Sequence, residues 1–71
     1  MLSYTAHAKK RMRQRKIIES EIEYCIEHYE IELPGKKGKL IYKCHTPTGR
    51  YLKVVIWKRN PNRILVVTVG D

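Results

Sequence analysis

The 71-residue sequence has no phenylalanine, only two cysteines and no long run of apolar residues. Its longest apolar runs, Val54 to Trp57 and Ile64 to Val67, contain four residues each, far fewer than the ~18 needed to span a bilayer. The first residues also lack the basic region and apolar stretch of a secretion signal. We therefore expect a protein that crosses no membrane and stays in the cytoplasm.

The few cysteines and histidines are not arranged as in the common metal sites. Cys25 and Cys44 are spaced neither as a metal-binding pair nor as a redox motif, and we expect both to be small buried thiols. The histidines at positions 7, 28 and 45 have no metal-ligand spacing, and no Gly-rich phosphate loop or nucleophile elbow is present. The sequence predicts no metal and no cofactor.

Acidic residues are almost absent from the second half of the sequence. Residues 33–71 carry nine basic side chains against Asp71 alone, whereas the six basic residues of 1–16 are balanced by the six glutamates of 17–32. The net charge of +8 therefore belongs to the second half. An excess of this size on a small surface favours a polyanionic partner such as RNA or DNA, the alternative being a merely soluble basic protein.

A chain of 71 residues has room for one domain. Two helices are predicted in its first part. The first begins at Ser3 or Thr5, either of which could cap it, and continues without Gly or Pro to about Lys16. The second, from about Glu19 to Tyr29, is predicted by apolar residues at helical spacing. These residues are Ile18, Ile22, Cys25, Ile26 and Tyr29.

Turn-forming residues divide the rest of the chain into strands. A short edge strand is predicted at Glu30 to Leu33, before Pro34 and the Gly-Lys-Lys-Gly turn at residues 35–38. A meander of three strands then follows at about Lys39 to Thr46, Tyr51 to Arg59 and Arg63 to Val69. The predicted fold class is α+β, with the two N-terminal helices on one face of a three- to four-stranded antiparallel sheet.

Two three-residue loops, Pro47-Thr48-Gly49 and Asn60-Pro61-Asn62, set the strand register, with Gly49 and Asn62 in the left-handed conformation. The first loop places His45 opposite Tyr51, Lys43 opposite Lys53 and Ile41 opposite Val55. The second places Val55 opposite Val67 and Trp57 opposite Leu65. One face is then almost entirely apolar and should receive the helices. It contains Leu40, Tyr42, Cys44, Leu52, Val54, Ile56, Ile64, Val66 and Thr68.

The other face carries an unusual pair, Lys43 across from Lys53. Like charges directly opposite each other destabilise a sheet, and such exceptions concentrate at functional sites. The next pair, His45 and Tyr51, adds an imidazole and a phenol, a combination that suits a phosphodiester. We predict that RNA phosphates bind this face, the alternative being a solvated basic edge. The candidate residues are Lys43, Lys53, Tyr51 and Arg59.

Trp57 lies on the same predicted face, beside Leu65, Val55 and Val67. It could stack a nucleic-acid base. Exposed apolar patches of this kind more often contact protein, so a protein partner is favoured at Trp57.

The first helix has a narrow apolar stripe formed by Tyr4, Ala8 and Met12. Arg15 falls inside this stripe, Arg11 at its edge and His7 just beyond. Long basic side chains can lay their stems on a core and extend their charged heads past its rim. Arg11 and Arg15 are therefore expected to be positioned rather than freely solvated.

The segment His7-Ala8-Lys9-Lys10-Arg11-Met12-Arg13-Gln14-Arg15 resembles the H-A-x-x-R-M-x-x-R opening of a widespread prokaryotic domain family without an assigned function. The ending Ile64-Leu65-Val66-Val67-Thr68-Val69 resembles the last strand of that family. Its members look like small relatives of the RelE and ParE toxins, within the wider group of barnase, EndoU and colicin-type ribonucleases. The resemblance implies a single RelE-like α+β domain over residues 1–71, an RNA-cleaving or translation-blocking toxin, and functional roles for His7, Arg11 and Arg15.

We therefore predict a toxin-like endoribonuclease that acts without a metal, by attack of an RNA 2′-hydroxyl on the adjacent phosphate. His7 or His45 would transfer a proton, while Arg11, Arg15 and the lysine pair would meet the developing negative charge. The helix motif should lie on one side of the sheet and the lysine pair on the other, so the two groups are expected to be separate and only one need be catalytic. The RNA would be cleaved on or off the ribosome, and an acidic antitoxin protein would be a further partner.

Three alternatives remain open. The protein could be a non-catalytic RNA- or protein-binding module, or a ParE-like toxin that inhibits a protein target. In the third, the helix motif is purely structural: Arg11 and Arg15 bridge to the glutamates of the second helix, and His7 helps to fix the N-terminal turn.

Overall fold

The computed structural model describes residues 2–71 and has the predicted α+β fold class. Two helices pack on a five-stranded sheet with strand order β1-β5-β4-β3-β2, in which only β1 and β5 run parallel. The elements are β1 (Leu2–Tyr4), α1 (Ala6–Arg15), α2 (Glu19–Glu27), β2 (Ile31–Pro34), the short 3-10 helix η1 (Lys36–Gly38), β3 (Leu40–His45), β4 (Tyr51–Asn60) and β5 (Arg63–Gly70).

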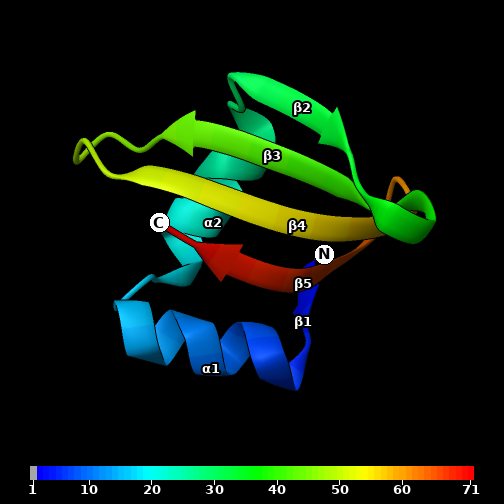
Figure 1. Ribbon diagram of the computed structural model, residues 1–71, viewed down its shortest axis with the longest axis horizontal. Helices are drawn as coiled ribbons and strands as arrows, with labels where there is room; N and C mark the ends of the chain where they lie inside the picture. Colours follow the sequence, from blue (N-terminus) through cyan, green and yellow to red (C-terminus); the bar gives the residue numbers. More distant parts are fainter. Residues whose placement is uncertain (1) are drawn as a thin grey trace.

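The two helices take different places on the sheet. Figure 1 shows α2 behind β3 and β4, whereas α1 lies alongside β5 at the edge of the sheet. Within residues 2–71 the sheet therefore has an inner face under α2 and an outer face that no helix covers.

No helix within residues 2–71 has both the length and the apolar character needed to cross a membrane.

Thr5 caps α1 and fastens it to the last strand. Its side-chain oxygen accepts a hydrogen bond from the Ala8 N–H at 3.0 Å and donates to the Val67 carbonyl at 2.7 Å. The Thr5 N–H donates to the Val66 carbonyl at 3.0 Å. Of the two caps that the sequence allowed, the chain uses Thr5, while Ser3 belongs to β1, a strand that the sequence reading did not anticipate.

The turn between the helices is held by Arg50 from the β3–β4 loop. Lys16 ends α1 in the left-handed conformation, with φ of 54°. The Arg50 Nη1 donates to the Lys16 carbonyl at 3.0 Å and lies 3.4 Å from the Glu21 Oε1 on α2. The bridges from Arg11 and Arg15 to the glutamates of α2, which the structural alternative requires, are not formed within residues 2–71, where Arg50 pairs with Glu21 and Arg15 with Asp71.

The β3–β4 hairpin confirms its predicted register. His45 pairs with Tyr51, Lys43 with Lys53 and Ile41 with Val55. In the loop, Gly49 has φ of 88°, and its N–H donates to the Thr46 carbonyl at 2.8 Å. The Pro47-Thr48-Gly49 loop thus forms the turn that was predicted from its residues.

The β4–β5 hairpin differs from its prediction at two bulges. Trp57 pairs with Leu65 as expected, but Val55 pairs with Thr68, because Val67 is an extra residue on β5. At the other end Asn60 pairs directly with Arg63, so the loop has two residues instead of three. Asn62 is not among the residues with positive φ; its N–H donates to the Asn60 Oδ1 at 2.9 Å, which tightens the turn.

The bulge at Val67 changes one member of the predicted core. Val69 points to the inner face and is 2% exposed, while Thr68 turns outward beside Val55. Cys25 and Cys44 are free and buried, as predicted. The buried apolar residues are Ala8, Ile17, Ile22, Cys25, Tyr42, Cys44, Leu52, Val54, Ile56, Val66 and Val69.

Several element boundaries also shift. The second helix ends at Glu27, two residues before the predicted Tyr29, and β2 begins at Ile31 rather than Glu30. In the turn at residues 35–38, the residues with positive φ are Lys37 and Gly38. Because β2 begins one residue later than predicted, Glu30 lies outside both the helix and the strand.

Candidate nucleic-acid interface

The outer face of the sheet carries the candidate residues of β3 and β4 in adjacent rows. One row consists of His45 and Tyr51. The next row across the sheet consists of Ile31, Lys43, Lys53 and Gly70. Residues paired in this way point to the same face, so the imidazole, the phenol and both ammonium groups lie together on the side away from α2.

Arg11 reaches this row from α1. A Cβ added to Gly70 would stand 3.9 Å from the Arg11 Nη2. Because Gly70 pairs directly with Lys53, that Cβ position lies on the outer face. The Arg11 Nη2 is therefore at van der Waals distance from a side-chain position in the row that contains Lys53.

This arrangement corrects one sequence-based expectation. The helix motif and the lysine pair were expected on opposite sides of the sheet, but α1 lies at the β5 edge. Its Arg11 Nη2 comes within 3.9 Å of a Cβ placed on Gly70. The Nε of Arg11 is buried and has no hydrogen-bond partner within residues 2–71. Arg11 thus touches the Gly70 end of the row that also contains Lys43 and Lys53.

The other two residues of the helix motif are more exposed. Arg15 lies 3.9 Å from the Asp71 carboxylate, measured from Nη1 to Oδ1, with half of its side chain exposed. His7 is exposed one turn before Arg11 and forms no hydrogen bond or ion pair with any residue of 2–71. The N-terminal turn is held by Thr5 instead of His7.

His45 is oriented by a carboxylate that the sequence analysis did not single out. Its Nδ1 lies 3.0 and 3.1 Å from the two carboxylate oxygens of Glu30, and its backbone N–H donates to the Glu30 Oε2 at 2.9 Å. The Glu30 N–H in turn donates to the Lys43 carbonyl at 2.9 Å. The Tyr51 ring lies 4.6 Å from the imidazole, centroid to centroid.

The Glu30 contact defines which His45 nitrogen is available for chemistry. The hydrogen bonds from the His45 backbone and side chain lower the pKa of Glu30, so the group is an ionised acceptor at neutral pH. Facing an acceptor, Nδ1 carries the hydrogen, which leaves Nε2 to exchange a proton. A signal for Glu30 existed, because an edge strand paired with β3 brings the residue before it to His45, but the sequence did not define that register.

Arg59 lies further along β4, at the second bulge. Its Cζ stands 4.7 Å from the centroid of the Trp57 ring. It is separated from Lys53 by six residues of strand, so it belongs to the same outer face but not to the group around His45.

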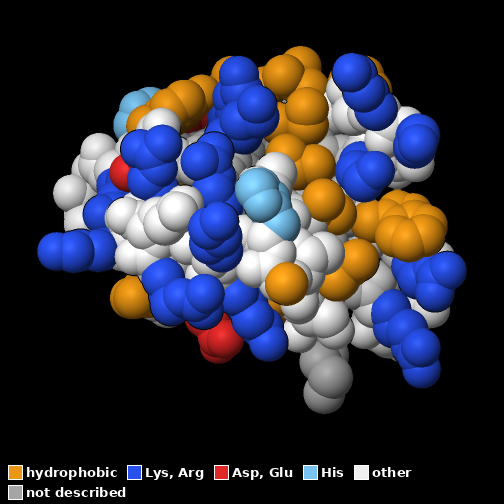
Figure 2. Space-filling model, turned by 60° about the horizontal axis from the view of Figure 1, so that its bottom comes forward, with side chains coloured by type: hydrophobic (Ala, Val, Ile, Leu, Met, Phe, Trp, Pro, Cys, Tyr) orange, Lys and Arg blue, Asp and Glu red, His pale blue; other side chains and the backbone are white. Residues whose placement is uncertain are grey.

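Figure 2, turned so that the α1 edge of the molecule comes forward, shows Lys and Arg side chains in separate groups, with a band of apolar side chains running between two of them. Acidic side chains are few in this view. Within residues 2–71 no three His, Cys, Asp or Glu side chains are grouped closely enough to hold a metal ion.

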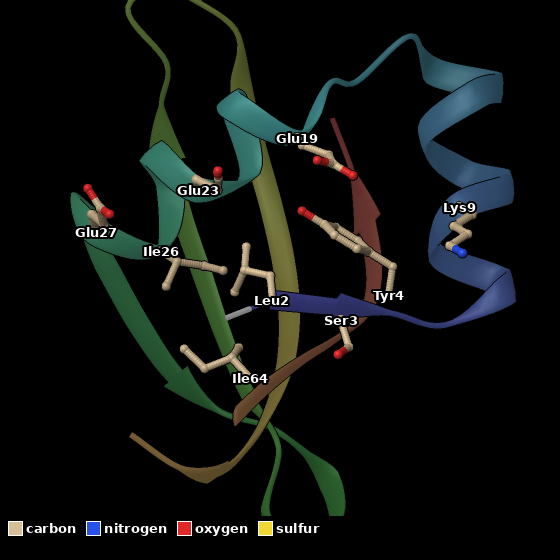
Figure 3. Close-up of a pocket in the computed structure, with 9 residues that line it drawn as sticks. All are labelled: Leu2, Ser3, Tyr4, Lys9, Glu19, Glu23, Ile26, Glu27 and Ile64. Atoms are coloured by element: carbon tan, nitrogen blue, oxygen red, sulfur yellow. The ribbon is translucent and has the colours of Figure 1, made fainter. Parts of the chain in front are cut away.

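A hollow of about 850 Å³ lies on the helix side of the sheet, between β1, α1 and α2. Figure 3 shows the Tyr4 hydroxyl pointing towards Glu19, with Lys9 across from it on α1. Burial, together with Glu19 and Glu23, raises the pKa of Tyr4. With Glu27 also on its wall, the hollow carries three carboxylates and one ammonium, so an anionic substrate is better accommodated on the outer face.

Comparison with known proteins identifies the family. Residues 4–71 match the family described as "Domain of unknown function (DUF4258)". The chain belongs to this family. No curated protein and no solved structure matches it. For this DUF4258 domain, the match spans both halves of the interface, the motif on α1 and the rows on β3 and β4.

Proposed function

We propose that this protein is a toxin-like endoribonuclease that cleaves RNA by internal attack of a 2′-hydroxyl. The observation that carries the proposal is the Glu30–His45 pair, with Nδ1 3.0 Å from the carboxylate, placed one row from the Lys43–Lys53 pair. A carboxylate-oriented imidazole is suited to proton transfer. Adjacent cations are suited to holding a phosphate.

The reaction needs few groups. The His45 Nε2 accepts the proton of the 2′-hydroxyl as that oxygen bonds to phosphorus. The negative charge that grows on the phosphate oxygens is met by Lys43, Lys53 and the Arg11 guanidinium. The bond to the 5′-oxygen breaks, and this oxygen takes a proton, for which the phenol of Tyr51 is a neighbouring O–H donor. The products carry a 2′,3′-cyclic phosphate and a 5′-hydroxyl.

The resemblance of the α1 motif to small relatives of RelE and ParE toxins supports the same reaction class. Arg11, which belongs to that motif, has its Nη2 3.9 Å from a Cβ placed on Gly70, the residue that pairs with Lys53. The helix motif and the strand patch would therefore act on one phosphate group as parts of one site.

The test incubates purified protein with RNA, with and without ribosomes and with chelator, and analyses the ends of the products. We expect cyclic phosphate ends that persist in chelator, loss of cleavage in His45→Ala and a large reduction in Glu30→Gln. His28→Ala is the matched control, because His28 is also an exposed histidine. Cleavage lost in His7→Ala but kept in His45→Ala would move the proton transfer to α1.

RNA binding without cleavage under any of these conditions would point to the non-catalytic binding module. Inhibition of a protein target in place of RNA cleavage would point to the ParE-like alternative. An acidic antitoxin would bind the same basic face, so its addition should compete with RNA.

A further inference from the structure

A second cluster on the outer face surrounds Trp57, towards the end of β4 that is far from Tyr51 and its partner His45. Trp57 is 39% exposed and pairs with Leu65. The Arg59 guanidinium lies over its ring, with Cζ 4.7 Å from the centroid. Stacked guanidinium and indole groups are the chemistry with which proteins hold nucleic-acid bases.

A hollow of about 380 Å³ adjoins this cluster through Arg59. Its lining residues are Ser3, Arg59, Asn62, Arg63, Ile64 and Leu65, which include two arginines and no acid. Neither arginine forms an ion pair with another residue of 2–71. The hollow has room for a small polar group, and two unpaired guanidinium groups suit a phosphate.

The distance between the two clusters suits a short strand of nucleic acid. Lys53 and Trp57 are four residues apart on β4, about 13 Å at 3.3 Å per residue. Both side chains point outward, and Val55 lies between them on the same face. A single strand that follows β4 would meet cations at Lys53, apolar surface at Val55 and the aromatic ring at Trp57.

The ring favours an unpaired base. In a duplex the faces of the bases are occupied by their neighbours, whereas an unpaired base can stack on an exposed aromatic side chain. The hollow beside the ring is lined by two arginines and no acid, which favours a polyanionic partner such as a nucleic acid.

We propose that the outer face binds single-stranded RNA in preference to duplex, with one unpaired base stacked on Trp57 and its phosphate held by Arg59 and Arg63. This inference rests on the proposed function, since it extends the same substrate beyond the His45 group.

Trp57 is the only tryptophan in the chain, so its fluorescence reports on this site alone. The probe is a short 2′-O-methyl RNA strand, which cannot cleave itself, used single-stranded and annealed to its complement. We expect the single strand to quench Trp57 emission and to bind more tightly than the duplex. In anisotropy measurements with the labelled strand, Trp57→Ala should weaken binding by roughly 5- to 150-fold, the range for loss of one stacked base.

Trp57→Phe should retain most of the affinity, because it keeps an aromatic face. Arg59→Gln should weaken binding more than Lys10→Gln, which removes an exposed charge on α1 away from the hollow. Circular dichroism of each variant confirms that it is folded. Bound single strand without quenching, equal affinity for duplex, or unchanged affinity in Trp57→Ala would overturn the inference and favour a protein partner at this patch.

The two proposals fail differently. If RNA is cleaved in a His45-dependent way while Trp57→Ala binds and cleaves normally, the stacking site is wrong and the nuclease stands. If the single strand quenches Trp57 but no RNA is cleaved, the stacking site stands and catalysis is wrong. If no RNA binds, both are wrong.

Discussion

Lys53 should have opposite effects on stability and on RNA binding. It faces Lys43 directly across the ladder, and its other neighbour, Gly70, is in contact range of the Arg11 guanidinium. Cross-strand pairs contribute ~0.2–1 kcal/mol, and like charges act against the fold. Lys53→Gln should therefore raise the free energy of unfolding by ~0.2–1 kcal/mol, which is about 1–8 °C in Tm for a domain of this size.

The same substitution should weaken RNA binding in a salt-dependent way. Each phosphate neutralised on a single strand contributes about −0.7 to the slope of log K against log salt. Lys53→Gln should make the slope less steep by about 0.7, and the double variant with Lys43→Gln by about 1.4. The gain in Tm should shrink at high salt, because added ions screen exposed charges.

The assays are thermal unfolding at low and high salt, and titration of an uncleavable RNA strand over the same salt range. Lys10→Gln serves as the control, since this exposed lysine of α1 has no like-charged partner in the sheet. A Lys53→Gln protein that is less stable than the parent, or one with an unchanged slope, would refute the argument that this pair trades stability for phosphate binding.

Three further outcomes test the fold around the site. Thr5→Val removes both hydrogen bonds of the hydroxyl and should lower the free energy of unfolding in urea by ~1–3 kcal/mol. Thr5→Ser should stay near the parent. Equal urea midpoints for Thr5→Val and the parent would contradict a stabilising role of these two hydrogen bonds. Since the Glu30 pKa is lowered in the folded state, its pairing stabilises the protein above the ordinary carboxylate pKa and is lost as pH falls through the lower folded value. Stability of Glu30→Gln should therefore fall less on acidification, and an unchanged pH profile would count against the pair. Gly49→Ala, at φ of 88°, should lower Tm by several degrees from ~1 kcal/mol of strain; no change would show that the loop relaxes.

The part of the fold that the sequence predicts well is encoded locally. In the Pro47-Thr48-Gly49 loop, the glycine supplies a left-handed residue at the place where the turn needs one. The loop then determines the register of β3 and β4, including the Lys43–Lys53 pair. The second loop has a similar composition, but the Asn60 side chain accepts the Asn62 N–H and shortens it. The sequence alone does not show whether this loop forms the Asn60 side-chain hydrogen bond or the three-residue turn that was predicted.

The part that the sequence does not predict depends on contacts between distant segments. The Val67 bulge is linked to Thr5, whose hydroxyl donates to the Val67 carbonyl and whose N–H donates to that of Val66. This contact joins residues 62 positions apart, and no periodicity in either segment indicates it. The parallel pairing of β1 with β5 belongs to the same contact, because β1 leads directly into Thr5.

The candidate site was predicted as separate halves because its assembly depends on these same long-range contacts. Residue types and register predict the lysine pair and His45 on β3 and β4, and the stripe on the first helix predicts that Arg11 is positioned. The β1–β5 pairing and the hydrogen bond from Thr5 to Val67 hold α1 at the sheet edge instead of beneath the sheet. A Cβ placed on Gly70 would be in van der Waals contact with the Arg11 Nη2, at 3.9 Å, so a longer side chain there would need the space next to the guanidinium. Filling that space tests the assembly: Gly70→Leu should displace Arg11 and weaken RNA binding to about the level of Arg11→Gln, while the double variant should bind no more weakly than either single one. Fully additive losses in affinity would show that Gly70→Leu does not act through Arg11, and would overturn the contact between them.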